Sequence, residues 1–169
     1  EGNFSIERLN GFTIHGKTVG VIGTGRIGQS FCRILTGFGA TIIAYDKFPS
    51  EEMKKLGVKY VGFDDVLEKS DIISLHCPLT PETHHMINAN SLRKMKKGVM
   101  LINTSRGKLV DTASVIEALR EEQLGSLAID VYEQEDKLFF RDLSEQVIRH
   151  EHISRLSILS NVLITATQG

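Results

Sequence analysis

Three glycines at fixed spacing form the first pattern in the sequence that indicates chemistry. The apolar run Thr18–Gly23 breaks into Gly-x-Gly-x-x-Gly, with glycines at Gly23, Gly25 and Gly28. In this pattern the first glycine permits a tight turn, the second lets the backbone touch a phosphate, and the third lets a helix pack closely on the strand. The N-terminus of that helix offers unpaired N–H groups and a partial positive charge to an anion. The segment therefore predicts a pyrophosphate site.

A carboxylate follows at the distance that a dinucleotide site requires. A second apolar run, Thr41–Tyr45, ends at Asp46, which lies 18 residues after Gly28. A carboxylate there accepts hydrogen bonds from the hydroxyls of an adenosine ribose. The combination predicts a nicotinamide or flavin dinucleotide. Asp46 would repel the 2′-phosphate of NADP, and Lys47 rather than an arginine follows it, so we expect a preference for NAD over NADP.

Other polar groups follow later apolar runs. They are His76-Cys77-Pro78, Asn103-Thr104-Ser105-Arg106-Gly107 and Asp130. Each group alone is equally consistent with a capped turn. Polar groups that converge on one edge of a sheet imply a ligand site, and in parallel sheets that site lies beyond the carboxyl ends of the strands.

The elements that would position these residues alternate along the chain. Short apolar runs, which predict strands, are separated by amphipathic patterns, which predict helices. The predicted strands are Thr18–Gly23, Thr41–Tyr45, Asp71–His76, Val99–Asn103, Leu127–Asp130 and Asn161–Thr165. The predicted helices are Ile27–Phe38, Asp64–Lys69, Ala89–Met95, Thr112–Glu122 and His152–Leu159, and Glu133–His150 reads as a long loop. Strands that are apolar throughout are covered on both faces, so the pattern predicts an α/β fold: a doubly wound parallel sheet of Rossmann type in three layers, α/β/α.

Bulk properties narrow the class of protein. The 169 residues suffice for one domain, which we assign to residues 1–169 with a lead-in segment at 1–16. A net charge of −1 does not favour electrostatic binding to nucleic acid, and no apolar run is long enough to span a bilayer. Cys32 and Cys77 lack metal-type spacing and fit reduced thiols, so we expect a cytoplasmic protein without a metal site. Because the chain begins with Glu1 rather than Met, we expect a fragment or a processed piece.

Taken together, the motifs resemble the D-isomer-specific 2-hydroxyacid dehydrogenases. The resemblance rests on residues 23–28, His76–Thr83, Asn103–Gly107 and Asp130–Glu135. Residues 2–5, 15–18 and 136–140 are most similar to the D-lactate dehydrogenases of that family. The resemblance runs from end to end of the chain but covers only the coenzyme-binding domain of the family. It implies that the substrate domain is absent from this chain and that the coenzyme is NAD.

The resemblance also implies roles for individual residues in coenzyme binding. Arg26 and Ile27 would lie along the pyrophosphate and adenosine, Asp46 would bind the adenine ribose, and Cys77 and Pro78 would cover the adenine. Thr83 matches a position that contacts the coenzyme, Thr104 and Ser105 would pass the nicotinamide end, and Asp130 would hold the nicotinamide ring or its amide.

Two further residues match catalytic positions of the family. Arg106 corresponds to the arginine that binds the carboxylate of a small 2-oxo acid such as pyruvate and polarises its carbonyl, for which a planar, always charged guanidinium is suited. Glu135 corresponds to the acid that hydrogen-bonds the catalytic histidine and raises its pKa.

The sequence departs from the family at the general acid itself. Thr167 stands where the family has its catalytic histidine, after the last predicted strand. A threonine hydroxyl does not exchange protons usefully near neutral pH, and loss of a general acid costs about 10² to 10⁴ in rate. We therefore expect this chain to bind coenzyme but to be inactive by itself. A truncation junction, an engineered inactivation and a natural degenerate copy all remain open as origins of Thr167.

Three functions follow from this combination. The first is the NAD-binding domain of a D-lactate-like dehydrogenase, whose parent reaction transfers hydride between NADH and a 2-oxo acid. The second is a non-catalytic NADH-sensing interaction module, similar to the corepressors that share the fold. The third is a folding or oligomerisation unit with weak coenzyme affinity. Family members pair through this domain, so we expect a homodimer, with Leu138–Phe140 as a candidate contact.

Overall fold

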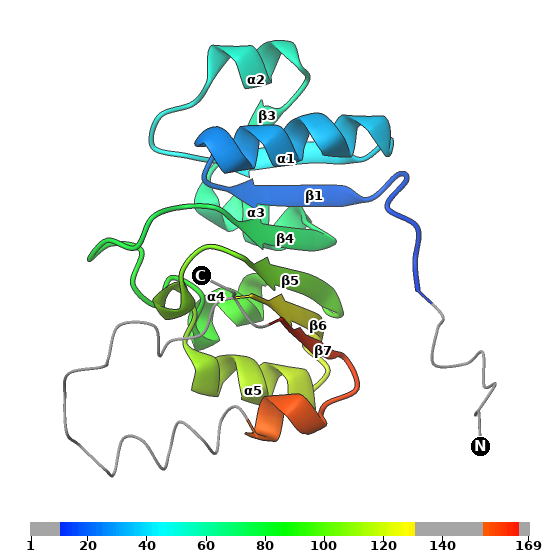
Figure 1. The fold of residues 1–169 in the computed structure, drawn as a ribbon, viewed down its shortest axis with the longest axis vertical. Coiled ribbons are helices and arrows are strands. Elements are labelled where there is room, and N and C mark those ends of the chain that lie inside the picture. The colour runs from blue at the N-terminus through cyan, green and yellow to red at the C-terminus, as the bar shows by residue number, and fades with distance from the viewer. Residues whose placement is uncertain (1–10, 131–153, 166–169) are drawn as a thin grey trace.

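The structure, a computed structural model, describes residues 11–130 and 154–165. These residues form a seven-stranded sheet in the order β3-β2-β1-β4-β5-β6-β7, with every neighbouring pair parallel. The strands are β1 (Thr18–Ile22), β2 (Thr41–Tyr45), β3 (Lys59–Tyr60), β4 (Ile72–Leu75), β5 (Val99–Asn103), β6 (Leu124–Ile129) and β7 (Val162–Ile164). The chain starts at β1, builds outward to β3 and then returns to build from β4 to β7 (Figure 1). The predicted doubly wound parallel sheet is confirmed.

Helices cover both faces of this sheet. They are α1 (Arg26–Gly37), α2 (Glu51–Lys55), α3 (Phe63–Lys69), α4 (Ala89–Lys94) and α5 (Thr112–Arg120), with a 3₁₀ turn η2 at Gly107–Leu109 and a helical stretch at 154–158. On one face, Leu35 of α1 and Met53 of α2 share an apolar cluster with Val21 of β1. On the other face, side chains of α3, α4 and α5 share a second cluster with β4, β5 and β6. The three-layer arrangement follows from these two clusters.

The sequence analysis missed helix α2, strand β3 and the 3₁₀ turn η2. Because of β3, the sheet has seven strands rather than the six predicted. Helix α2 has five residues, of which only Met53 is buried, and β3 has two. Segments this short show no hydrophobic period. Strand β6 also begins at Leu124, three residues before the predicted start. Among the described residues, no helix combines the length and the apolar character that crossing a membrane requires.

A carboxylate links neighbouring segments at the amino-terminal edge of the sheet. Asp71 Oδ2 accepts a hydrogen bond from Thr18 N at 2.8 Å, and Oδ1 pairs with Lys96 Nζ at 3.0 Å. Burial by itself raises the pKa of Asp71, but the Thr18 N–H together with Lys96 holds that pKa below its usual value. The charged carboxylate therefore ties β1 and β4 together at the end of the sheet that lies opposite the glycine-rich turn.

Candidate functional site

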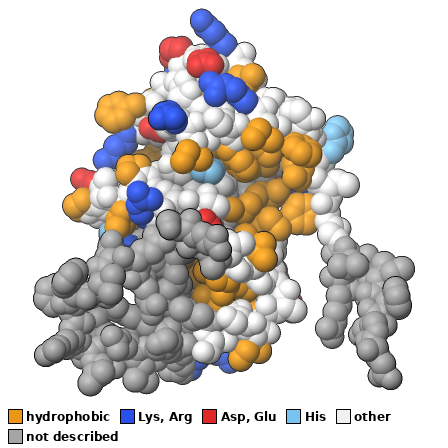
Figure 2. All heavy atoms as spheres, in the orientation of Figure 1, with side chains coloured by type: hydrophobic (Ala, Val, Ile, Leu, Met, Phe, Trp, Pro, Cys, Tyr) orange, Lys and Arg blue, Asp and Glu red, His pale blue; other side chains and the backbone are white. Residues whose placement is uncertain are grey.

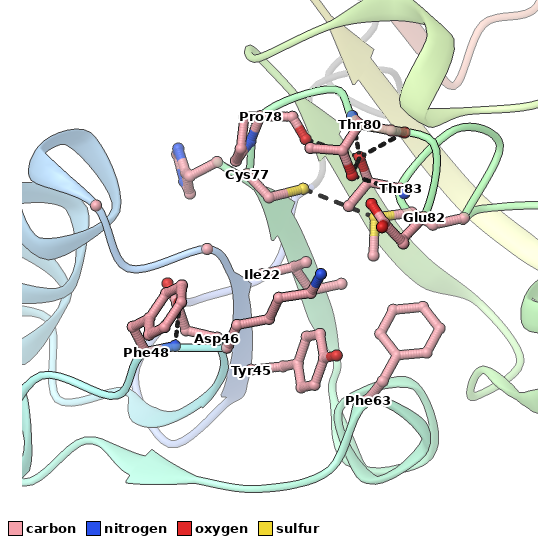
Figure 3. Close-up of a pocket in the computed structure, with 15 residues that line it drawn as sticks. Ile22, Tyr45, Asp46, Phe48, Phe63, Cys77, Pro78, Thr80, Glu82 and Thr83 are labelled. Atoms are coloured by element: carbon pink, nitrogen blue, oxygen red, sulfur yellow. Dashed lines mark hydrogen bonds between the residues drawn. The ribbon is translucent and has the colours of Figure 1, made fainter.

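A cavity of about 470 Å³ lies at the carboxyl ends of β1, β2 and β4. These strands flank the point where the chain reverses its direction of winding, between β1 and β4. In open α/β sheets this switch point is where ligands bind. The turn after β1 and residue 46 form one side of the cavity, and residues 77–83 form the opposite side (Figure 3).

The first and third glycines of the turn are required by packing. Gly23 has φ +94°, and a Cβ built on it would lie 2.6 Å from Cys77 N. A Cβ on Gly28 would lie 2.1 Å from the carbonyl oxygen of Gly23. The turn therefore packs against the β4 loop on one side and against the first turn of α1 on the other. Both roles predicted from the sequence, a tight turn and close helix packing, agree with these contacts.

The second glycine faces open space. Gly25 has an ordinary φ of −69°, is exposed, lines the cavity, and a Cβ built on it meets no atom within 4 Å. It is also the N-cap of α1, it provides no side-chain cap for the helix, and no acidic residue occupies the first turn. The start of α1 thus leaves open space beside Gly25, and the unpaired N–H groups of a helix N-terminus suit a phosphate. Arg26 and Ile27, at the start of α1, are both exposed.

Asp46 lines the cavity and is held by three donors. Its Oδ2 accepts from Thr24 N at 2.5 Å and from Thr24 Oγ1 at 3.0 Å, and its Oδ1 accepts from Phe48 N at 2.8 Å. The carboxylate is therefore fixed to the glycine-rich turn, which brings together the two motifs that the sequence analysis connected by spacing alone.

The opposite wall comes from the loop after β4. Cys77, Pro78 and Thr83, for which coenzyme contacts are predicted, line the cavity. The Thr83 hydroxyl donates to Pro78 O at 2.8 Å and accepts from Thr80 N at 2.7 Å, so it closes the turn that forms this wall. Cys77 Sγ lies 3.7 Å from Met86 Sδ, and burial raises the pKa of Cys77 to about 11, which keeps it a neutral thiol.

Sequence reasoning missed the aromatic part of the cavity. Tyr45 and Phe63 meet edge to face with ring centroids 5.6 Å apart, and both line the cavity with Phe48 and Met86. Phe48 is 84% exposed. The sequence could have indicated Phe48 as part of the site. It is a large apolar residue two positions after Asp46, beyond the end of a predicted strand, where no hydrophobic core would bury it. Phe63 gave no such signal, since it opens a short helix.

His76 lies beneath the glycine-rich turn. Its Nε2 is 2.9 Å from Ser74 Oγ, and its ring centroid is 5.0 Å from that of Phe31 on α1. Burial lowers the pKa of His76, which favours the neutral imidazole. His76 therefore supports the turn through packing, and it also contributes to the lining of the cavity.

The remaining predicted residues lie at the ends of β5 and β6, outside the lining of the cavity. Ser105 Oγ donates to Cys77 O at 2.7 Å, which ties this loop to the cavity wall. Thr104 and Arg106 are exposed, and Arg106 Nη1 donates to Ser105 O at 2.8 Å. The Asp130 carboxylate accepts a hydrogen bond from Thr165 Oγ1.

Several predictions fall outside the described residues. They are Glu135, the candidate contact Leu138–Phe140, and Thr167 in place of the family histidine, and the predicted loop Glu133–His150 is a fourth. The structure describes only residues 11–16 of the lead-in segment predicted at 1–16.

An all-parallel doubly wound sheet, a glycine-rich turn and an acid after β2 around one switch-point cavity define a dinucleotide-binding domain. Residues 1–168 match the family described as D-isomer specific 2-hydroxyacid dehydrogenase, NAD binding domain. The chain belongs to this family, and both the resemblance found in the sequence and the coenzyme that it implied are confirmed at that level.

Relatives and solved structures agree with this assignment. D-lactate dehydrogenase of Escherichia coli strain K12 is 52% identical over 169 residues, which are 100% of this chain and 51% of the relative. The structure of Salmonella D-lactate dehydrogenase matches with a TM-score of 0.87 and 54% identity, over 97% of this chain and 50% of that one. D-lactate dehydrogenase with NAD+ from Lactobacillus jensenii matches with a TM-score of 0.82 and 37% identity, over 93% and 47% of the two chains. The chain thus spans about half the length of these proteins.

Proposed function

We propose that this chain binds NAD in the cavity between β1, β2 and β4, as the coenzyme domain of a D-lactate-like 2-hydroxyacid dehydrogenase. The observation that carries the proposal is the open space at Gly25 beside the fixed carboxylate of Asp46 on one cavity. The pyrophosphate would lie on Gly25 and the N–H groups of α1, with Arg26 and Ile27 along the pyrophosphate and adenosine. Asp46 would bind the ribose, and Cys77, Pro78 and Thr83 would enclose the adenine side.

Gly25→Ala tests this placement without disturbing the fold. A methyl group there meets no protein atom within 4 Å and no unusual φ, but it occupies the proposed phosphate space. We expect NADH affinity to fall at least about tenfold while the thermal midpoint stays unchanged, since the binding loss removes charge-assisted hydrogen bonds. Gly37→Ala is the matched control, because its methyl group also meets nothing but lies at the far end of α1. Equal NADH affinity in both variants would contradict the proposal.

On the nicotinamide side we propose roles for residues at the ends of β5 and β6. Thr104, Ser105 and Asp130 would contact the nicotinamide end, where the bound coenzyme supplies the hydride. Arg106 would bind the carboxylate of a 2-oxo acid such as pyruvate, with Glu135 as partner of the family histidine. Because Thr167 stands in place of that histidine, we propose that this chain does not reduce pyruvate by itself. NADH oxidation followed by its absorbance tests this, and turnover above the uncatalysed rate would contradict it.

We further propose that the chain pairs with a second copy and acts in the cytoplasm. Ile34 of α1 and Phe38, the C-cap of that helix, are 60% and 53% exposed. Figure 2 shows hydrophobic side chains gathered on one face of the molecule. The free thiols of Cys32 and Cys77 are compatible with a reducing compartment. Sedimentation across a range of protein concentrations tests pairing, and a single monomeric species throughout would contradict it.

A further inference from the structure

A chain of hydrogen bonds reaches Asp46 from the outer edge of the sheet. Ser50 N donates to Tyr60 Oη at 3.0 Å, Tyr60 Oη donates to Thr24 Oγ1 at 2.8 Å, and Thr24 Oγ1 donates to Asp46 Oδ2 at 3.0 Å. Tyr60 belongs to β3, one of the two edge strands of the sheet, where it pairs with Ala44 of β2. Thr24 is only 4% exposed. Neither Tyr60 nor Thr24 lines the cavity, so both stand behind the carboxylate that does.

The groups at the two ends of this series of hydrogen bonds fix the direction in which each bond is donated. A backbone N–H only donates, and an ionised carboxylate only accepts. Because Ser50 N supplies a hydrogen to Tyr60 Oη, the phenol hydrogen is directed to Thr24. Because Tyr60 then fills an acceptor position of Thr24 Oγ1, the threonine hydrogen is directed to Asp46. Without the phenol hydroxyl, Thr24 Oγ1 loses the donor behind it, and its hydrogen bond to Asp46 is no longer polarised and strengthened by the bond from Tyr60.

The bonds to Asp46 leave one direction for a ligand. A carboxylate has about four lone-pair positions. Bonds within the described residues fill two of them on Oδ2, both from Thr24, and one on Oδ1, from Phe48 N. The remaining position lies on Oδ1. Thr24 thus holds the carboxylate by one oxygen and leaves the other to receive a sugar hydroxyl.

We propose that Tyr60 is a positioning residue for coenzyme selectivity, acting through Thr24 to hold the Asp46 carboxylate in the orientation that accepts an unphosphorylated ribose. The inference rests on the proposed function, in which Asp46 binds the adenosine ribose of NAD. A carboxylate free to turn could move away from a 2′-phosphate. A carboxylate held in place cannot, so the same hydrogen bonds favour NADH and penalise NADPH.

The test measures dissociation constants for NADH and NADPH with the whole chain and its variants. Tyr60→Phe keeps the ring and removes only the hydroxyl. We expect its NADH affinity to fall about three- to tenfold, the effect of one hydrogen bond, with NADPH affinity unchanged or higher. Thr24→Val, which also removes a donor to Asp46, should reduce selectivity at least as much, and Thr24→Ser should retain it. A Tyr60→Phe protein with the selectivity of the unmodified chain would overturn the proposal.

Ser50→Ala provides a matched structural control. Ser50 Oγ accepts from Met53 N at 3.4 Å and caps α2, whereas the bond to Tyr60 comes from the Ser50 backbone. The variant therefore loosens the same segment but keeps the hydrogen-bond chain. We expect a lower thermal midpoint with unchanged NADH to NADPH selectivity. If Ser50→Ala alters selectivity as Tyr60→Phe does, loosening explains the effect and the proposal is rejected.

An Asp46→Ala background separates this proposal from the function on which it rests. If Asp46→Ala binds NADH as tightly as the unmodified chain, the proposed role of Asp46 fails. If Asp46→Ala weakens NADH binding, the double variant then decides the role of Tyr60. We expect Tyr60→Phe to have no further effect there, since it acts through the carboxylate. An equal loss in both backgrounds would overturn the role of Tyr60 while leaving that of Asp46 intact.

Discussion

The two halves of the carboxyl edge of the sheet are built in different ways. Around β1, β2 and β4, Asp46 is held by three donors and Gly23 packs on the β4 loop, and together they bound a cavity. Around β5 and β6, Thr104 and Arg106 are exposed, and neither they nor Asp130 line that cavity. The difference indicates that the coenzyme half is preorganised within this chain. Among the residues that the structure describes, Thr104 and Arg106 of the other half are exposed and are not enclosed in the same way.

The largest expected effect that tests this comparison is Gly28→Ala. A methyl group there would lie 2.1 Å from Gly23 O, so the backbone of the turn must shift. We expect NADH affinity to fall more than tenfold and the free energy of unfolding to fall by about 1–3 kcal/mol, measured by titration and denaturant unfolding. Gly37→Ala, on the same helix but with open space, should instead be neutral or stabilising by up to about 1 kcal/mol. A well-bound NADH in Gly28→Ala would show that the turn is not rigid.

The next largest expected effect is a difference in NADH affinity between two variants, one with a substitution near β1, β2 and β4 and one with a substitution near β5 and β6. Asp46→Ala removes the proposed ribose acceptor, so we expect NADH affinity to fall about tenfold or more. Arg106→Ala removes an exposed side chain outside the cavity and should leave NADH affinity unchanged. Calorimetric titration of both variants measures this contrast. If Arg106→Ala costs as much as Asp46→Ala, the nicotinamide half is also preorganised and the comparison is wrong.

A smaller effect compares the two thiols within one molecule. Burial raises the pKa of both Cys32 and Cys77 from 9.0 to about 11, so at neutral pH each thiolate fraction is about a hundredfold below that of an exposed thiol. Only Cys77 lines the cavity. We expect slow alkylation of both thiols and further protection of Cys77 alone by NADH, measured by mass spectrometry. Protection of Cys32 to the same degree would indicate a global rather than a local effect of coenzyme.

The smallest expected effect concerns pH. The pKa of His76 is lowered from 6.5 by burial, so the unfolded chain binds a proton at a pH where the folded chain does not. The contribution of His76 therefore reduces the free energy of unfolding as pH falls below 6.5 towards its lowered value. Denaturant unfolding between about pH 7 and pH 5 measures this, and His76→Gln should flatten the dependence. An unchanged slope in the variant would assign the dependence to other groups.

The sequence predicted the framework because the framework depends on local rules. The glycine spacing, the apolar strands and the acid after Tyr45 each report a requirement that acts over a few residues. The switch-point cavity then followed from topology. Within the described residues, Thr41–Tyr45 and Val99–Asn103 are observed with the predicted ends, and other ends, such as Glu122 against the observed Arg120, differ by up to three residues.

The rest could not be predicted because it depends on contacts between distant segments. The bond from Tyr60 to Thr24 spans 36 residues and that from Ser105 to Cys77 spans 28. Strand β3 has no pattern of its own and exists because it pairs with β2. Thr83 matched a coenzyme position by motif, yet its hydroxyl closes a turn, a role that only geometry reveals.

The carboxylate of Asp71 sits at the edge of the sheet that faces away from the coenzyme cavity, bonded to Thr18 and Lys96. Substitutions near Asp71 can therefore change thermal stability independently of coenzyme selectivity, which depends on residues at the opposite edge of the sheet. Substitutions around Asp71 should alter how much intact protein a cell accumulates, whereas those around Asp46 should alter which reduced nucleotide the protein draws from the cell.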